Sequence, residues 1–562
     1  MAKKHPSARP ASVSAPAPDT PFQWPLWLPV LAAVAVFSII LTFQMTGVDD
    51  HAATVENPVV RDFSLTALFS HFNLGMYAPL TWLGYAMAYP FGGADGANPW
   101  SYHLLSLLVH LYSTWLVTRL LLRLQVQRNV AVLTALLFAV HPIQVESVAW
   151  IAGFSTPLFS MLSLLAAHFW LDYAHEGKGA ARNGLAIIVF IAACLAKSAA
   201  VTLPLMLLVL DAWKTGKWLD RSRLLQYIPL FAISLFFGGL TIYSRTQANM
   251  VIGVSDLSYT WWERLVLVAY TPVFYWAKML WPLHLNIYYS FDKAGGSLPW
   301  YYFTAPIVWV AVLGAAWKYR RQAPYLLVGL AFFMANIVVT LPFAPMGQFE
   351  LRADHYNYLA AIGIFYLLLE GSRQLAATRG RGWATTVTGI WVAFCVVLGF
   401  IQVRTWKDTL TVVSNAIDHG FYQQGMMYFA RGVEYGDLRR PQEAIKDFTS
   451  AIELKPDMKD AYKFRGSLYA QAGQIDLAQK DLEKYLEYDP ADVVTWNNMA
   501  MIYMRKNQLD KSLAAFTKAI ELKPDAAISW QNRARIHQMM GNAEKANEDI
   551  RKAKELATAP KE

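Results

Sequence analysis

The sequence predicts an all-α protein in which a polytopic transmembrane helical domain is followed by an α-solenoid of helical repeats. Two observations lead to this prediction. First, 55% of the residues are hydrophobic, 14% are aromatic and only 16% are charged, which is too apolar for an ordinary soluble enzyme. Second, the long apolar runs stop near residue 403, and the rest of the chain is charged and helix-prone. Two domains of different character are therefore expected.

The lengths of the apolar runs give the membrane spans. The first run, Trp24 to Phe43, covers about 20 residues, which is enough to cross a bilayer. No small-x-small cleavage motif precedes Asp49, so this span is expected to be retained. The further predicted spans are 102–123, 129–145, 153–174, 184–212, 227–244, 303–317, 324–342, 356–370 and 385–403. With 184–212 counted as a hairpin, the prediction is about 11 crossings.

The short loops give the orientation, because Lys and Arg favour the cytoplasmic side of a membrane. All basic clusters fall on the same side of the membrane only when the segment 261–281, which is rich in Trp and Tyr, does not cross it. This segment is therefore expected to be interfacial or re-entrant. The amino terminus is then cytoplasmic, and the loop 44–101 and everything after residue 403 are extracytoplasmic. The hairpin 184–212 stays open: it is short for two crossings and Lys197 lies at its centre, so a re-entrant pair fits as well.

The predicted domain limits follow these shifts in composition. Residues 1–23 are rich in Lys, Pro, Ala and Ser and are expected to form a disordered cytoplasmic tail. The transmembrane domain is expected at 24–403, a linker helix at 404–424 and the repeat domain at 425–562.

Charge, cysteine content and missing motifs exclude other classes of protein. The net charge is +9, but basic and acidic residues nearly balance beyond residue 423, so the excess lies beside the membrane and no nucleic-acid partner is expected. Cys194 and Cys395 both lie in apolar runs, which offers neither a disulfide framework nor a CxxC metal site. The sequence contains no nucleotide-binding loop, HExxH or GxSxG motif, so ATP-driven and serine-hydrolase chemistry lack support.

A period of 34 residues marks the repeat domain. Pro456, Pro490 and Pro524 close the phrases AIELKP, YLEYDP and AIELKP, which is typical of the tetratricopeptide repeat. Equivalent positions hold large aromatic and then small residues, which are Tyr428, Tyr462, Trp496 and Trp530, and Gly432, Gly466, Ala500 and Ala534. The small residues are expected to let two helices approach, and about four repeats would form a concave surface. We interpret this surface as a protein-binding groove; a folding or dimerisation module is the alternative.

Charged residues beside the membrane are the first candidates for a site, because burying a charge in a bilayer costs roughly 2.5–3.5 kcal/mol and such residues tend to be functional or paired. Asp49 and Asp50 begin the first outer loop. A carboxylate there could take the proton of an acceptor hydroxyl and so make its oxygen nucleophilic. A solvated helix flank is the alternative. A divalent ion at the pair stays open, because the spacing shows no third ligand.

A second group of candidates interrupts apolar sequence. His141 and Glu146 lie in FAVHPIQVESVAWIAG and could contact sugar or phosphate, because Pro142 ends or kinks a helix and exposes a polar step. A buried histidine with a carboxylate partner is the alternative. Lys197 is a candidate phosphate ligand, with snorkelling of its ammonium to the interface as the alternative.

The phrase RADHYNYL supplies the last candidates, which are Arg352, Asp354, His355 and Tyr356. Arg352 suits a lipid phosphate, because its planar fork can donate two parallel hydrogen bonds. An ion pair with Glu350 or Asp354 is the alternative.

The order of several phrases resembles one known family, the transmembrane and tetratricopeptide-repeat O-mannosyltransferases and their bacterial relatives. The matching phrases begin at Pro79, His103, Ala135, Ala196, Arg352 and Thr405, and they read PLTWLGY, HLLSLLVHL, ALLFAVHPIQVESVAWIAG, AKSAAVTLPLMLLVLDAW, RADHYNYLAAIGIF and TWKDTL. No phrase is a catalytic fingerprint alone, but their order followed by the repeats is specific. The resemblance covers nearly the whole chain beyond the tail.

The resemblance implies a glycosyltransferase C-type fold, a polyprenyl-phosphate sugar as donor, and an acidic residue of the first external loop as base. Carried over by position, one of the two neighbouring aspartates becomes this base, and Arg352, His355 and Tyr356 would lie near the donor phosphate. One departure is the phrase GFST at 153–156, where bacterial relatives usually have a charged run such as ERKD. This departure leaves the sugar and the acceptor pocket open.

The expected function is inverting transfer of a sugar from the lipid-linked donor to a hydroxyl of an extracytoplasmic protein, such as a pilin, that the repeats hold. The expected location is the inner membrane of a bacterium, with membrane lipid, lipid-linked sugar and acceptor protein as partners and no metal or other cofactor assigned. One alternative is a non-enzymatic scaffold whose repeats assemble an envelope or pilus complex. Another is a ligase or polymerase of lipid-linked glycans, which would be expected to have a longer late external loop than 343–355 or 371–384.

Overall fold

The computed structural model describes most of the chain. The described residues are 23–73, 75–93, 95–218, 223–247, 259–291, 293, 296–343, 351–379, 382–420 and 424–558. The predicted tail 1–23 lies outside this part apart from its last residue, and so does Glu350.

Helices make up nearly all regular structure in these residues. Six helices are long and apolar enough to cross a membrane, or seven if the bent pair Arg128–Val140 and Pro142–Ala149 counts as one span. Three shorter apolar helices, Leu28–Thr42, Ala180–Ala196 and Pro324–Thr340, accompany them. The predicted all-α fold with a multi-pass membrane domain is confirmed, while the number of crossings stays a prediction.

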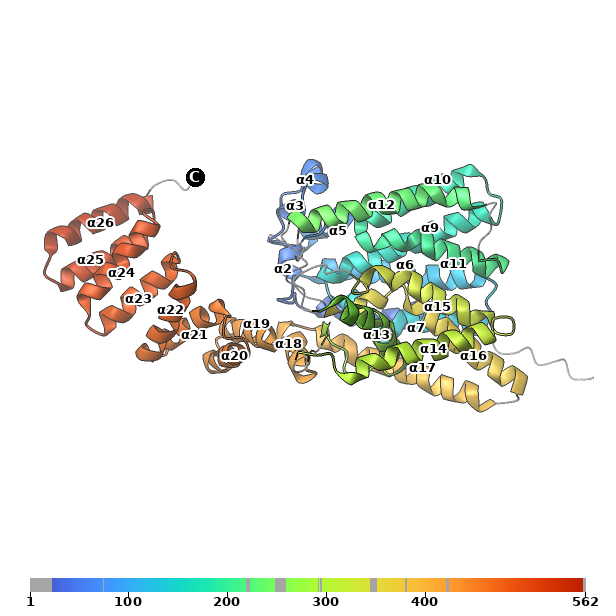
Figure 1. Ribbon diagram of the computed structural model, residues 1–562. Coiled ribbons are helices and arrows are strands. Elements are labelled where there is room, and N and C mark those ends of the chain that lie inside the picture. Colours follow the sequence, from blue (N-terminus) through green and yellow to red (C-terminus); the bar gives the residue numbers. More distant parts are fainter. Residues whose placement is uncertain are drawn as a thin grey trace, which may run out of the picture.

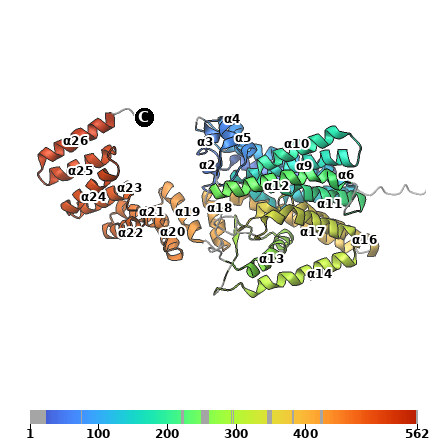
Figure 2. The same cartoon turned by 45° about the horizontal axis from the view of Figure 1, so that its top comes forward.

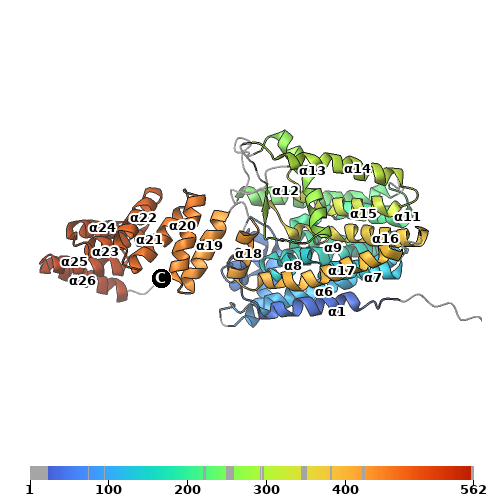
Figure 3. The same ribbon diagram turned by 90° about the horizontal axis from the view of Figure 1, so that it is seen from below.

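The long helices of the membrane domain form one bundle (Figure 1). They are α1 (Leu28–Phe37), α6 (Trp100–Arg123), α7 (Arg128–Val140), α9 (Ser155–Ala174), α10 (Ala180–Ala196), α11 (Leu203–Thr215), α12 (Leu224–Gln247), α14 (Ala305–Lys318), α15 (Pro324–Ile337), α16 (Ala361–Arg379) and α17 (Gly382–Gln402). Helices α1 and α7 both pack against α6 and α17 (Figure 3). Their side chains share one apolar core, which includes Phe37, Phe138 and Tyr358.

Short turns of 3-10 helix extend or join the longer elements. They are η1 (Ser38–Thr42), η2 (Tyr89–Phe91), η3 (Pro142–Gln144), η4 (Ala152–Phe154), η5 (Ser198–Thr202), η7 (Trp300–Thr304), η8 (Val338–Thr340), η9 (Asp354–Asn357) and η10 (Val403–Trp406).

Helix α7 is interrupted where the sequence predicted a break. The residue before a proline is driven to extended backbone, and His141, before Pro142, has φ −62° and ψ 137°. The following segment Pro142–Ala149, which consists of η3 and the short helix α8 (Val145–Ala149), is bent by 51° from α7. This bend turns the polar side chains that follow the proline into the end of the bundle.

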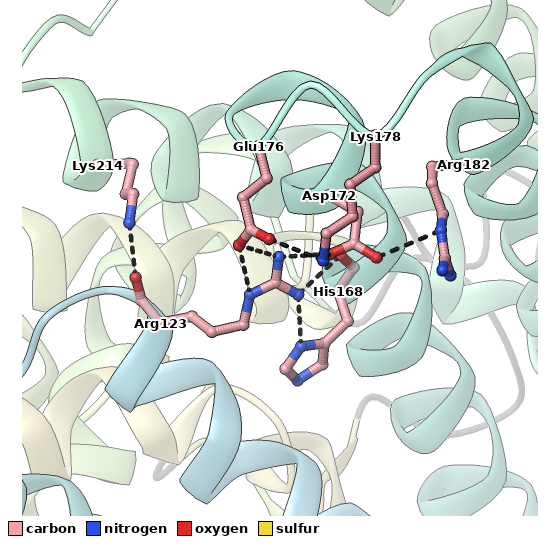
Figure 4. A network of polar contacts seen from close by, with 7 residues as sticks. All are labelled: Arg123, His168, Asp172, Glu176, Lys178, Arg182 and Lys214. Carbon is pink, nitrogen blue, oxygen red and sulfur yellow. Dashed lines mark hydrogen bonds and ion pairs between the residues drawn. The ribbon is translucent and has the colours of Figure 1, made fainter.

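Lys197 marks a second break, at which extended backbone with φ −157° and ψ 134° separates α10 from η5 and α11. The far ends of these two helices lie at the same end of the bundle, because Lys178, just before α10, and Lys214, in the last turn of α11, belong to one polar network (Figure 4). Residues 180–215 therefore form an antiparallel hairpin that is longer than the predicted 184–212. Lys197 lies at its turn.

The network in Figure 4 ties helix ends together at the end of the bundle that lies away from the repeats. Arg123, in the last turn of α6, contacts Asp172 at 2.7 Å and Glu176 at 2.5 Å. Lys178 contacts the same two carboxylates at 2.9 and 2.8 Å, and Lys214 Nζ donates to the Arg123 carbonyl at 2.7 Å. The network therefore joins α6, α9 and both helices of the hairpin.

Helix α13 (Trp261–Leu280) runs across the direction of the long helices (Figure 3). It is not among the helices that are long and apolar enough to cross a membrane. The interfacial or re-entrant placement of 261–281 stays a prediction. Beyond α13, β1 (Tyr289–Ser290) pairs antiparallel with β2 (Leu351–Arg352), a short ladder that sequence analysis did not predict.

The first loop folds into short helices that cover one end of the bundle (Figure 1). They are α2 (Asp50–Ala53), α3 (Pro58–Arg61), α4 (Leu65–Ser70) and α5 (Pro79–Ala88). At the same end, α18 (Thr409–Asp418) connects the bundle to the repeats. The aspartate pair and the repeat domain therefore share one end of the bundle.

The repeats form a row of antiparallel helix pairs that extends from α18 (Figure 2). Their helices are α19 (Gln424–Asp437), α20 (Pro441–Leu454), α21 (Lys459–Gln471), α22 (Ile475–Tyr488), α23 (Val493–Arg505), α24 (Leu509–Leu522), α25 (Ala527–Met539) and α26 (Ala543–Thr558). The predicted small residues lie where two helices pack closely, as expected. A Cβ on Gly432, for example, would lie 2.8 Å from Phe448. The predicted aromatics have a second role, since Trp496 and Trp530 each donate at 2.9 Å to the carbonyl of the proline six residues earlier.

A buried ion pair recurs inside the repeats. Arg431 binds Asp447 with two hydrogen bonds of 2.7 and 2.9 Å, Arg465 binds Asp481 in the same way, and so does Arg533 with Asp549. The third repeat has the buried apolar residues Met499 and Ala515 at the equivalent positions. The chain therefore contains both an ionic and an apolar version of one contact.

Candidate functional site

Asp50 is a structural anchor of the loop that follows η1. Its Oδ2 accepts hydrogen bonds of 2.8 Å from the backbone N–H and the hydroxyl of Thr46, and its Oδ1 accepts one of 2.8 Å from Ala152 N–H. Only 1% of Asp50 is exposed, and burial raises the pKa of its carboxyl to about 7. The side chain thus pins the loop to η4 and has no oxygen directed at solvent.

Asp49 has the opposite character. It precedes α2 with a left-handed φ of 63°, its side chain makes no capping hydrogen bond, and it is exposed. Neighbouring protein removes part of its hydration, which raises the pKa of its carboxyl. Asp49 borders a cavity of about 50 Å³ whose other walls include Trp82, Trp150 and Ser155. Of the two aspartates, Asp49 is the one that lines this cavity.

Trp150 fixes the wall opposite the first loop. Its Nε1–H donates to the Val48 carbonyl at 2.8 Å, and its ring packs on Trp406 and His355 with centroids 5.9 Å apart in both cases. Because Val48 directly precedes Asp49, this indole sets the position of the aspartate relative to the bundle.

Lys197 lies behind the same cavity. Its Nζ donates to Thr156 Oγ1 at 2.6 Å, beside the wall residue Ser155. The preceding carbonyl, of Ala196, accepts a 2.8 Å hydrogen bond from the wall residue Thr81. The cavity therefore has a carboxylate on one side and an ammonium close to the other.

Arg245 adds a second cation to this region. It lies in the last turn of α12, close enough to Lys197 and Tyr356 for its charge to act on both groups. Sequence analysis missed Arg245. The available signal was a basic residue just after the predicted span 227–244, at the end that was expected to lie outside, whereas the basic clusters used for the orientation were expected inside.

Glu146 and His355 form a tight pair. The carboxylate accepts the His355 backbone N–H at 2.8 Å through Oε2 and contacts His355 Nδ1 at 2.8 Å through Oε1. Burial and the charge of Lys197 lower the pKa of His355, so its ring is uncharged at neutral pH. The two predicted residues, 209 positions apart, are thus brought together.

Two tyrosines connect this pair to the cavity. The pKa of Tyr288 lies well above its ordinary value, mainly because the residue is buried and to a smaller extent because Asp49 and Glu146 carry negative charge nearby. Tyr356 is half-buried near Glu146 and Arg245, and burial also raises its pKa. Both hydroxyls therefore keep their protons at neutral pH and can donate hydrogen bonds.

Asp354 faces a separate, very small cavity of about 10 Å³, which Glu146 and Asn286 also line. Its Oδ2 accepts a 3.0 Å hydrogen bond from the Tyr289 hydroxyl. Burial raises its pKa well above the ordinary value, and the charge of Glu146 acts in the same direction. Asp354 is thus a neighbour of the Glu146 pair and does not line the Asp49 cavity.

Arg352 is enclosed by aromatic rings. Its guanidinium carbon lies 4.1 Å from the ring centre of Phe274, 4.5 Å from that of Phe291 and 5.4 Å from that of Tyr270, and 6% of the residue is exposed. Cation–π contacts with these rings stabilise the buried charge. A role of Arg352 in phosphate binding stays a prediction, because the cage holds the guanidinium inside the protein.

His141 is fully buried, and both ring nitrogens are occupied within the fold. Nε2–H donates to the Met279 carbonyl at 2.9 Å, and Nδ1 accepts from Ile143 N–H at 3.2 Å. Neither ring nitrogen of His141 is therefore free for the predicted contact with sugar or phosphate. The alternative of a buried, satisfied histidine fits, although its partners are backbone groups and Glu146 pairs with His355 instead.

The described residues contain no group of three or more His, Cys, Asp and Glu side chains arranged to hold a metal ion. The two free cysteines are buried.

Comparison with known proteins identifies the repeats. Models of the tetratricopeptide repeat match residues 429–493 and 493–526. Among solved structures, MamA from Desulfovibrio magneticus RS-1 is 23% identical, with a TM-score of 0.26 over 26% of this chain and 84% of that chain.

The chain is also similar to proteins that are named transferases. Protein O-mannosyl-transferase Tmtc2 of Drosophila melanogaster is 29% identical over 251 residues, which cover 42% of this chain and 26% of that protein. Protein O-mannosyl-transferase TMTC1 of Homo sapiens is 24% identical over 505 residues, which cover 75% of this chain and 54% of that protein. The predicted resemblance to the transmembrane and tetratricopeptide-repeat O-mannosyltransferases is confirmed. The chain spans only about a quarter to a half of the length of these two relatives.

Proposed function

We propose that this protein is a membrane glycosyltransferase that moves a sugar from a polyprenyl phosphate to a hydroxyl group of an extracytoplasmic protein, such as a pilin or another envelope protein, held by the repeats. The observation that carries the proposal is the cavity at the repeat end of the bundle, which has the accessible carboxylate of Asp49 on one side and Lys197 close to the other. The similarity to O-mannosyl-transferases supports glycosyl transfer as the chemistry.

In the proposed reaction Asp49 is the general base. Its carboxylate takes the proton of the acceptor hydroxyl as that oxygen attacks the anomeric carbon of the sugar. The bond from the anomeric carbon to the phosphate oxygen breaks on the opposite face, so the configuration inverts and polyprenyl phosphate leaves with the bonding electrons. The raised pKa of Asp49 suits this task, since a base works best when its pKa approaches the working pH.

Lys197 and Arg245 are proposed to bind the phosphate. Negative charge grows on the leaving phosphate in the transition state, and fixed cations in a site with little water stabilise such charge. Thr156 holds the ammonium of Lys197 at 2.6 Å, so the cation is oriented before the donor binds. Tyr288 and Tyr356, which stay protonated, are placed to donate further hydrogen bonds in the same region.

The proposed orientation places the Asp49 end outside the cytoplasm, in a bacterial inner membrane. The basic network of Arg123, Lys178 and Lys214 lies at the opposite end of the bundle, where the positive-inside tendency favours the cytoplasm. Nucleotide-activated sugars are scarce outside the cytoplasm, so a lipid-linked donor is the consistent choice.

The test is transfer by the purified protein in nanodiscs, measured by the intact mass of an acceptor protein incubated with polyprenyl-phosphate sugars. We expect Asp49→Asn to reduce transfer at least about 100-fold, within the range for loss of a general base. Asp62→Asn is the matched control, because Asp62 belongs to the same loop but pairs with Arg61 on the surface. Equal transfer by wild type and Asp49→Asn, at equal protein levels, would overturn the proposed role.

A further inference from the structure

Helix α18 touches the Asp49 loop directly. The backbone N–H of Gly47 donates to the hydroxyl of Thr409, the first residue of α18, at 3.0 Å, and Gln44 N–H donates to the Lys407 carbonyl at 3.0 Å. The approach is close, since a Cβ on Gly47 would lie 3.2 Å from the methyl group of Thr409. The loop is therefore attached to the start of α18 on one side and, through Asp50, to η4 on the other.

Helix α18 also binds the segment that leads to Tyr288. Asn415 Nδ2 donates to the Leu285 carbonyl at 2.9 Å, and Asn286 Nδ2 donates to the Ala416 carbonyl at 3.4 Å. Residues 285 and 286 lie just before Tyr288, whose hydroxyl is near Asp49. Before α18, Trp406 packs on Trp150, the indole that binds Val48.

The other face of α18 belongs to the repeats. Val412, Val413 and Ala416 share one apolar core with Met427 of α19, so the core of the bundle continues into the first repeat. Arg431, whose guanidinium group binds Asp447, also donates a hydrogen bond of 3.3 Å to the Ser414 hydroxyl of α18. A shift of the first repeat therefore cannot leave α18 in place without breaking these contacts, because packed cores transmit displacement.

We propose that α18 transmits the position of the repeat domain to the Asp49 loop, with Thr409 as the positioning residue that orients this loop. The proposal rests on the proposed function in that Asp49 is the group being placed. The hydroxyl of Thr409 and the backbone N–H of Gly47 fix the loop two residues before the aspartate. An acceptor protein that binds the repeats would thus change the position of Asp49, in addition to raising the local concentration of the acceptor hydroxyl.

The first arm of the test compares Thr409→Val with Thr409→Ser in the full-length protein. Valine keeps the shape but removes the hydroxyl, so we expect amide hydrogen exchange in 44–50 to become about 10-fold faster, as for loss of one hydrogen bond. With saturating donor and acceptor, kcat should fall about 10-fold or more while the KM for the lipid donor is unchanged, because misplacing a catalytic group acts on the chemical step. Serine should restore both values.

The second arm tests transmission. Ser414→Ala removes the contact between α18 and Arg431 without touching the loop, and it should still speed exchange in 44–50. Ser467→Ala is the control, because that hydroxyl bonds only within its own helix, to the Lys463 carbonyl. Unchanged exchange in Ser414→Ala overturns the transmission, and unchanged exchange and kcat in Thr409→Val overturn the positioning role.

The exchange readout needs no donor, which separates this inference from the proposed function. If wild type transfers no sugar but Thr409→Val and Ser414→Ala speed exchange in 44–50, the link stands and the proposed function falls. If wild type transfers sugar and neither variant changes exchange, the function stands and the link falls.

Discussion

Asp49 and Asp50 are adjacent in the chain, but only Asp49 presents its carboxylate to the cavity at the end of the bundle, because Asp50 is bound by Thr46 and Ala152. One carboxylate is thus free for chemistry, and the other builds the loop that presents it.

The role of Asp50 predicts a pH-dependent stability. Burial raises its pKa to about 7, whereas an unfolded aspartate has a pKa of about 3.9. The folded state binds the proton more tightly, so this contribution to stability is full below about pH 4 and is lost as the pH rises through about 7, a loss of up to about 4 kcal/mol. We expect the melting temperature to fall between pH 5 and pH 8.

Asp50→Asn checks this assignment, because the amide does not titrate in this range, although its NH2 group cannot accept one of the hydrogen bonds that the two carboxyl oxygens accept. Its melting temperature should vary much less over the same pH range. A variant that keeps the wild-type pH slope would assign the slope to another group.

The proposed phosphate role of Lys197 predicts a defect in donor binding. Lys197→Met should raise the KM for the lipid donor about 10-fold or more, because a charge-assisted hydrogen bond contributes roughly 1.5–3 kcal/mol. Lys214→Met is the matched control at the opposite end of the bundle, where its Nζ binds the Arg123 carbonyl. Steady-state kinetics with varied donor would contradict the assignment if both variants had the same KM.

The ion pair in the second repeat predicts strong non-additivity. Asp481→Ala should destabilise the repeat by about 3 kcal/mol or more, because it leaves Arg465 buried without its carboxylate. The double variant Arg465→Met, Asp481→Ala should come within about 1 kcal/mol of wild type, since buried pairs can be replaced by apolar side chains of similar volume.

The third repeat is a natural precedent, since Met499 and Ala515 occupy the equivalent positions. Hydrogen exchange across 459–488 reports the local stability of the second repeat. Additive effects of the two substitutions would show that the pair is not an energetic unit.

The turn inside each repeat predicts a stabilising substitution. Arg439, Gly473, Asn507 and Gly541 occupy equivalent turns with φ of 57°, 75°, 57° and 77°, a region that favours glycine. Arg439→Gly should stabilise the first repeat by about 0.5 kcal/mol, because relief of left-handed strain outweighs the added chain entropy. Gly473→Ala should destabilise the second repeat by about 1 kcal/mol. Thermal unfolding checks both, and the opposite order would contradict the strain argument.

Sequence periodicity was sufficient for the repeats and the apolar spans, because those patterns depend on local contacts. The 34-residue spacing of the prolines located the helix pairs, and the proline after His141 located the bend between α7 and α8. The hairpin around Lys197 is longer than predicted, because polar residues such as Arg182 and Lys214 continue its helices beyond the apolar run.

The candidate site was less accessible to sequence reasoning, because its geometry comes from distant contacts. Glu146 meets His355 across 209 positions, and no local pattern distinguishes Asp49 from Asp50, whose partners include Ala152. The aromatic cage of Arg352 is built from α13 and the segment around β1, so its enclosure could not be predicted from the charge alone.

The hydrogen bond between Gly47 and Thr409 joins residues 362 positions apart. Contacts of such separation form late in folding, and a chain acquires its structure from the N-terminal part onward during synthesis. The Asp49 loop can therefore take its final form only after the last helix of the bundle and the start of α18 have been made and packed. A nascent chain carries both aspartates from an early stage, but their arrangement is completed only when the two domains have been joined.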